Sequence, residues 1–226
     1  MNTRSMSRLC GILFLLTIAA FLVGNMVLTE PLQDKEHYAN TFQLVRENAL
    51  QYRVGIFMAF MGVIAQFALA ITLFQILKAQ NPFSALLALG WRIGEQVLLT
   101  VGILAGFVIL GLSQTVPLPP GSGAAESDYL GQLLVSVSVY AQAIAFVFLG
   151  IASVFNNMLF YKGKLIPSAL AMLGVIGAVL YALGYGLPMI VDLPTEFQSI
   201  LPLPLILFEL ILGFYLTIWG TKEETA

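Results

Sequence analysis

The chain alternates between long apolar runs and short polar segments. The apolar runs cover about residues 9–28, 54–77, 83–112, 129–155, 166–190 and 201–219. Each run has close to, or more than, the roughly 20 residues that a helix needs to cross a bilayer. Transmembrane β-strands are shorter and alternate in polarity, so continuous runs of this length indicate helices. The pattern predicts an all-α fold, a six-helix transmembrane bundle that forms a single integral membrane domain over residues 1–226.

The polar segments between the runs have the composition of loops. Thr29–Arg53 separates the first two runs, and Thr115–Gly123 follows the third with prolines and glycines that end a helix. Lys162–Lys164 and Asp192–Glu196 separate the last three runs. The loops therefore join six successive membrane spans.

The first long loop contains a helical pattern of its own. Tyr38, Phe42, Val45 and Ala49 recur at i, i+4, i+7 and i+11, and Asp34 is placed to cap the start of a helix. The spacing predicts an amphipathic helix. We expect it to lie on the membrane surface or over the bundle, and the alternative is a lid above an outward-facing cavity.

Lysine and arginine positions predict the orientation, because cytoplasmic loops are enriched in both. With the N-terminus inside, the inner side carries Arg4, Arg8, Lys78, Lys162, Lys164 and Lys222, and the outer side carries Lys35, Arg46 and Arg53. This bias and the even number of spans place both termini in the cytoplasm. The first run has no clear small-x-small site, which favours a retained helix over a cleaved signal peptide.

Composition supports a membrane protein and excludes several other classes. Apolar residues make up 59% of the chain and charged residues 10%, against about 45–50% and about 25% in soluble domains. A soluble globule, a disordered chain and a nucleic-acid binder are therefore excluded. With one cysteine, Cys10, and one histidine, His37, no intrachain disulfide, His-based zinc site or Cys/His catalytic pair is available. The sequence names no cofactor and no metal.

Three ionisable residues fall inside the predicted spans: Arg92, Glu95 and Glu209. Each costs about 2.5–3.5 kcal/mol at the centre of a span if it is unpaired. Arg92, Glu95 and Gln96 are spaced i, i+3 and i+4 and so share one helix face. Arg92 lies about 14 Å into its span and Glu209 about 12 Å into its own from the other side. Both are near mid-depth, which makes an Arg92–Glu209 contact between helices feasible.

Two glutamines join this polar layer, Gln66 in the second span and Gln142 in the fourth. One base and two acids leave a net negative charge when all are ionised, and an apolar site favours a carboxyl that holds a proton. Three interpretations stay open: a neutralised packing clamp, a ligand or proton site, and a catalytic acid/base. The third lacks a nucleophile-and-base pair, so the sequence disfavours an enzyme without excluding one.

Small residues mark another face of the third span. Gly90, Gly94, Gly102 and Gly106 form two GxxxG patterns, which let neighbouring helix backbones approach closely. Gly90 lies about 200° from Arg92 around the helix. The third span is therefore expected to be close-packed on one side and polar on the other, in a central position.

Several motifs occur in an order and spacing that resemble a known family. They are Arg8-Leu-Cys-Gly-Ile-Leu-Phe, Tyr52-Arg53-Val-Gly55, Trp91-Arg92-Ile-Gly-Glu95, Phe208-Glu209-Leu-x-x-Gly213 and Trp219-Gly220. The chain resembles, over nearly its whole length, the domain-of-unknown-function family four-three-eight-six of prokaryotic polytopic membrane proteins. The resemblance implies a bundle of about six spans in a cytoplasmic membrane and places Arg53, Arg92, Glu95 and Glu209 at family-like positions. It implies no activity.

The leading hypothesis is a multi-pass membrane protein whose Arg92/Glu95/Glu209 network binds a small ligand, a lipid or a proton for transport or sensing. Six spans are few for a monomeric carrier, so transport would call for a homo-oligomer. The alternative is a structural or accessory subunit of a larger membrane complex that uses the network as a clamp. The lipid bilayer is the partner common to both.

Overall fold

The computed structural model describes residues 3–34, 38–115 and 124–221. Most of these residues are helical, with no strand among them, and six helices are long and apolar enough to cross a membrane. The candidate spans are Arg4–Leu32, Ala49–Leu77, Pro82–Thr115, Asp128–Lys162, Ser168–Met189 and Glu196–Ile218. The prediction of an all-α fold with six spans is confirmed. Lys35, His37 and Lys222, and most of the loop after Thr115, lie outside the described residues.

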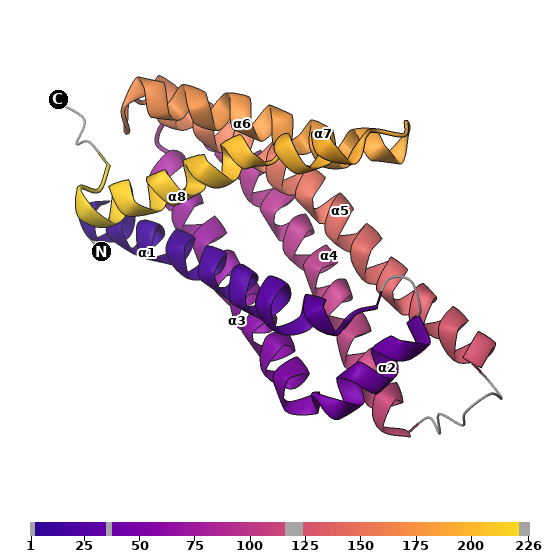
Figure 1. Ribbon diagram of the computed structural model, residues 1–226. Coiled ribbons are helices and arrows are strands. Elements are labelled where there is room, and N and C mark those ends of the chain that lie inside the picture. Colours follow the sequence, from indigo (N-terminus) through magenta and orange to yellow (C-terminus); the bar gives the residue numbers. More distant parts are fainter. Residues whose placement is uncertain (1–2, 35–37, 116–123, 222–226) are drawn as a thin grey trace. The chain divides into compact units, whose positions relative to one another are not determined.

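The helices follow one another with short connections (Figure 1). They are α1 (Thr3–Phe21), η1 (Leu22–Thr29), η2 (Glu30–Leu32), α2 (Tyr38–Glu47), α3 (Ala49–Leu77), α4 (Pro82–Thr115), α5 (Ala124–Lys162), α6 (Ser168–Gly186), η3 (Leu187–Met189), α7 (Thr195–Ile200) and α8 (Leu203–Ile218). The first span is not uniform, because α1 continues into η1, a π-helix of 8 residues. Within it the Thr29 hydroxyl donates to the Asn25 carbonyl oxygen at 3.2 Å.

The chain forms two compact units, each made of separate stretches of sequence. Unit 1 comprises Met1–Thr17, Ala65–Val97 and Ala143–Ala226, and unit 2 comprises Ile18–Ile64 and Leu98–Gln142. Helices α1, α3, α4 and α5 contribute to both units, whereas α6, α7 and α8 belong to unit 1 and α2 belongs to unit 2. A single integral domain stays a prediction.

Unit 1 is held together by close approaches between helices. α6 and α8 lie side by side in Figure 1, and a methyl group added at Gly177 would lie 2.8 Å from the Leu205 nitrogen. A methyl added at Gly150 would lie 2.7 Å from the Ala182 side chain. Both termini lie at one end of this unit, where Ser7 and Thr221 share a buried 2.8 Å hydrogen bond between their hydroxyls.

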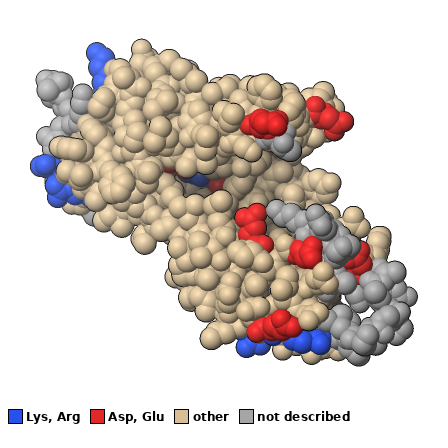
Figure 2. Space-filling view, in the orientation of Figure 1, with Lys and Arg blue, Asp and Glu red and all other residues tan. Residues whose placement is uncertain are grey.

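Charges divide between the two ends of unit 1. Figure 2 shows blue side chains at the end that carries the termini, while red side chains lie at the far end of α6 and α8. The acids at that far end, Asp192 and Glu196, flank the start of α7. Polar ends with apolar helices between them are the arrangement expected of a membrane-spanning unit.

Unit 2 has an apolar core that α2 covers. Its buried members are Leu32, Phe42, Val45, Tyr52, Ile56, Ile109, Leu110 and Val135. The predicted amphipathic helix is therefore present as α2, and its apolar face packs over the helices of this unit. The loop before it is fastened, since the Asp34 backbone N–H donates to Thr41 Oγ1 at 3.0 Å and the Asn40 amide donates to Asp34 Oδ2 at 2.9 Å.

Candidate functional site

A buried ion pair lies on one face of α4 in unit 1. Because Arg92 and Glu95 are three residues apart, they occupy the same side of the helix. Arg92 Nη1 donates to Glu95 Oε2 at 3.0 Å, and the two side chains are 5% and 0% exposed. Gln96, on the same face, is also fully buried. The pair is therefore formed within a single helix and removed from solvent and lipid alike.

A second carboxylate reaches the same guanidinium from α8. Glu209 Oε1 lies 3.9 Å from Arg92 Nη2, and 15% of the Glu209 side chain is exposed. The two carboxylates therefore differ: Glu95 is hydrogen-bonded and enclosed, whereas Glu209 is more loosely paired and partly accessible. Arg92 stands between them as the single cation.

Glutamines extend the network to a third helix. Gln96 Nε2 donates to Gln66 Oε1 on α3 at 2.8 Å, and the Gln96 side chain also hydrogen-bonds to Glu95. Gln66, Gln96, Glu95, Arg92 and Glu209 thus form one continuous polar chain across α3, α4 and α8. Interhelical hydrogen bonds of this kind fix the rotation of membrane helices, where lipid offers no alternative partner.

Two atoms of the ion pair have hydrogen-bonding capacity to spare. Arg92 Nε and Glu95 Oε1 are buried and form no hydrogen bond with the described residues. Buried polar atoms in folded proteins are usually paired with protein or ordered water. Arg92 Nε and Glu95 Oε1 therefore keep a donor and an acceptor that the described residues do not use.

Aromatic side chains from α5 and α6 adjoin the network. Tyr181 and Tyr185 have ring centroids 5.0 Å apart, and Phe146 lies 5.7 Å and 4.7 Å from them. Tyr181 interacts electrostatically with Glu209 and Glu95, and Cys10 of α1 interacts in the same way with Arg92. Phe146, Tyr181 and Tyr185 were not predicted from the sequence as part of the site. A tyrosine pair spaced i, i+4 inside an apolar span was the signal available.

The remaining candidates lie elsewhere. Gln142 is half-buried in unit 2, and no hydrogen bond joins it to another described residue. A methyl added at Gly94 would lie 2.9 Å from Phe148, and one at Gly102 would lie 3.2 Å from Ser138 Oγ. At Gly106 the nearest atom, of Ile56, is 3.5 Å away, and at Gly90 nothing lies within 4 Å. The roles proposed for these residues stay predictions.

A metal centre is not assembled in the part of the chain that the structure describes. There, no group of three or more His, Cys, Asp or Glu residues is placed to hold an ion. The polar chain therefore consists of a guanidinium, carboxylates and amides. These groups bind protons, water and small polar molecules by hydrogen bonding and charge.

Six apolar helices define a multi-pass integral membrane protein, in contact with a lipid bilayer. The family model described as Domain of unknown function (DUF4386) matches residues 9–220, so the chain belongs to this family, and the resemblance found in its motifs is confirmed. Neither the search of curated proteins nor the search of solved structures produced a match.

Proposed function

We propose that this protein binds a proton at Glu209, within the Arg92/Glu95/Glu209 network, and uses it for transport or sensing. One observation carries the proposal: the two carboxylates around Arg92 are unequal. Glu95 is enclosed and hydrogen-bonded at 3.0 Å, whereas Glu209 lies at 3.9 Å with 15% of its side chain exposed. A group that exchanges protons needs access and a weaker partner, and Glu209 has both.

Charge balance explains what the proton would do. Arg92 and Glu95 neutralise each other, so an ionised Glu209 leaves the network with one surplus negative charge. A proton on Glu209 removes that charge, which an apolar surrounding disfavours. When the proton leaves, attraction between Glu209 and Arg92 draws α8 towards α4, because Coulomb attraction is strong where water is scarce. Protonation of Glu209 thereby weakens the contact between α4 and α8, and loss of the proton strengthens it.

The orientation proposed for the protein has both termini in the cytoplasm of a prokaryotic cell, in the inner membrane. Support comes from the basic residues at the terminal end of unit 1 and the acidic Asp192 and Glu196 at its other end. In this orientation the network lies between the two surfaces. Transport would call for a homo-oligomer, because six spans provide few helices to enclose a pathway.

Infrared difference spectroscopy of the reconstituted protein tests the proposal. The carbonyl stretch of a protonated carboxyl lies apart from that of a carboxylate, so titration with pH reports proton exchange directly. We expect a titrating band that shifts in deuterated buffer, disappears in Glu209→Gln and persists in Glu196→Gln. Glu196 is the matched control because it is exposed and lies in the same membrane span.

The competing function is that of a structural or accessory subunit, in which the network is a fixed clamp. A clamp requires no exchangeable proton, so a spectrum without a titrating band that depends on Glu209 would overturn our proposal. The clamp also predicts that Glu209→Gln lowers the melting temperature in detergent as much as removal of Glu95 does. Purification with a partner at fixed stoichiometry would support the accessory role.

A further inference from the structure

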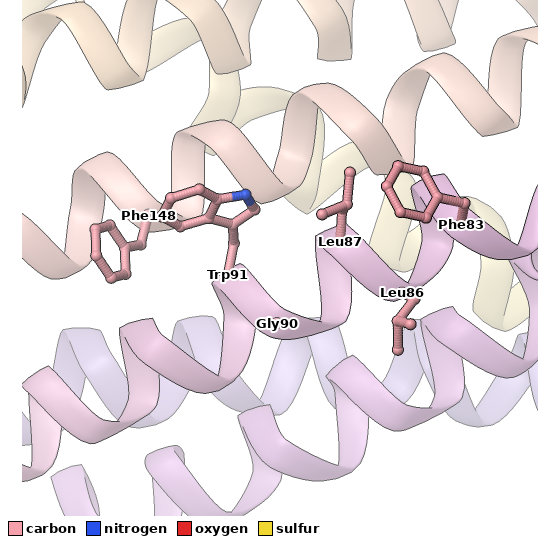
Figure 3. A pocket seen from close by; sticks show the side chains of 6 residues that line it. All are labelled: Phe83, Leu86, Leu87, Gly90, Trp91 and Phe148. Carbon is pink, nitrogen blue, oxygen red and sulfur yellow. The ribbon is translucent and has the colours of Figure 1, made fainter.

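A groove of about 360 Å³ runs along unit 1 on the surface of α4 and α5. Figure 3 shows the residues that line it: Phe83, Leu86, Leu87, Gly90, Trp91 and Phe148. Phe83, Leu86, Leu87 and Gly90 follow the i, i+3, i+4, i+7 spacing and so form one stripe along α4. The groove lies apart from Arg92, Glu95 and Glu209, and none of its lining residues is charged.

The shape of the groove depends on two local features. Gly90 supplies no side chain, and a methyl there would meet nothing within 4 Å, so space opens beside the helix. Trp91 and Phe148 form a wall, with ring centroids 4.9 Å apart and planes at 75°. From Phe83 to Trp91 the groove extends about 12 Å along α4 at 1.5 Å per residue. That length fits within one leaflet, about half of the roughly 30 Å hydrocarbon core.

Lysines lie where the groove reaches the end of unit 1. The turn before α4 and the turn after α5 touch, since a methyl at Gly163 would lie 2.5 Å from the Gln80 side chain. Exposed lysines lie on both turns: Lys78, Lys162 and Lys164. The Lys78 ammonium lies over the Phe74 ring at 5.9 Å. Lys162 and Lys164 flank Gly163, which lies against Gln80, three residues before Phe83 in the chain. Neither turn carries an acidic residue.

Lys164 has an unusual backbone conformation for a lysine. Its φ is 51°, in the left-handed region, where glycine is the common residue at a helix end. The Leu165 and Lys164 N–H groups donate to the Phe160 and Tyr161 carbonyls, both at 3.2 Å, which is the Schellman pattern. Glycine occupies the preceding position, Gly163, rather than this one. A lysine here is conformationally unfavourable, which points to a use for its ammonium group.

We propose that the groove binds one acyl chain of an anionic phospholipid, whose phosphate is held by Lys162 and Lys164. The apolar lining suits the chain, the length fits one leaflet, and the two ammonium groups complement the headgroup at the end of the groove. Zwitterionic lipids would share the groove but gain less from the lysines. The site is separate from Glu209 and does not depend on the proposed proton exchange.

Tryptophan quenching by brominated lipids tests this site directly. The chain has two tryptophans, and Trp219→Phe leaves Trp91, which lines the groove, as the single reporter. The protein is reconstituted into vesicles in which either an anionic or a zwitterionic phospholipid carries the brominated chain. We expect the anionic lipid to quench Trp91 with about tenfold higher apparent affinity.

Variants separate the headgroup site from general charge effects. In the Trp219→Phe background, the pair Lys162→Gln and Lys164→Gly should abolish the preference for the anionic lipid. Glycine at position 164 suits the backbone, so folding is retained. Arg4→Gln removes a charge at the same end of unit 1 and should keep the preference. Gly90→Leu fills open space and should lower quenching by both lipids.

Two results would overturn the proposal. One is equal quenching of Trp91 by both brominated lipids in the Trp219→Phe protein. The other is an anionic preference that survives replacement of Lys162 and Lys164, because the selectivity would then arise elsewhere.

Discussion

The two units of this protein differ in the residues that hold their helices together. Unit 2 buries no charged side chain among its described residues, and its core is formed by apolar residues from α2, α3, α4, α5 and the segment before α2. Unit 1 buries Arg92 and Glu95 and pairs Arg92 with Glu209 as well. Unit 2 therefore shows that helices of this chain pack together without buried charge. The need for packing alone does not account for the network in unit 1. This contrast favours a functional role for the charges.

Removal of the central cation, Arg92, should cause the largest loss of stability and so the clearest difference between the two units. Arg92→Met leaves Glu95 buried without a counter-charge, and breaking a buried pair from one side costs roughly 3–5 kcal/mol. We expect a loss of that size in the free energy of unfolding, measured by denaturant titration in detergent micelles. Substitutions of similar volume in the apolar core of unit 2 should cost less.

A charge-free variant sharpens the same comparison. Arg92→Met combined with Glu95→Leu and Glu209→Gln removes all three charges, and apolar replacement of a buried ion pair is often neutral in stability. The triple variant should recover most of the loss while failing to exchange a proton. A triple variant that is no more stable than Arg92→Met would show that unit 1 needs its charges to fold.

The next largest effect should come from the core of unit 2. Phe42 is buried on the inner face of α2, and Phe42→Ala creates a cavity that costs about 3 kcal/mol. Hydrogen exchange should accelerate in α2 and stay unchanged around Arg92 in unit 1. Gln43→Ala, on the exposed side of α2, is the control and should have little effect. Unchanged exchange in α2 after Phe42→Ala would contradict its role as part of the core.

The smallest predicted effect is a difference in stability loss between substitutions of Gln66 and Gln142, which occupy similar positions in their apolar runs. Gln66→Leu removes the 2.8 Å hydrogen bond to Gln96, and such bonds between membrane helices average about 0.6 kcal/mol, with a maximum near 1.7 kcal/mol. Gln142→Leu, in unit 2, removes no hydrogen bond to a described residue and should change stability by less than about 0.5 kcal/mol. Parallel thermal unfolding in one detergent measures both. Equal losses would mean that Gln142 has a partner of its own.

These glutamines also show where sequence reasoning stops. The six spans and α2 could be predicted because run length and apolar spacing are local properties. The shared face of Arg92, Glu95 and Gln96 followed from the helical repeat for the same reason. Gln66 and Gln142 each lie near the middle of an apolar run, and the rotation of each helix about its own axis decides which neighbours its glutamine meets. A one-dimensional pattern does not encode that rotation.

Other features were invisible for related reasons. The π-helix at Leu22–Thr29 lies in a continuous apolar run, where every helical period fits equally well. The groove beside Gly90 depends on what α5 places opposite that glycine. The left-handed conformation of Lys164 is the opposite of what its residue type suggests.

The spacing of Arg92 and Glu95 also has a consequence for how the protein is made. Helices enter the membrane in the order of synthesis, and α4 is complete long before α8 supplies Glu209. A lone arginine in a nascent helix would oppose its release into lipid. Because Glu95 is one turn away in the same segment, α4 carries its own counter-ion during insertion. Glu209 on α8 is synthesised later and meets a helix whose charges are already balanced. Insertion of α4 into the membrane therefore does not depend on Glu209.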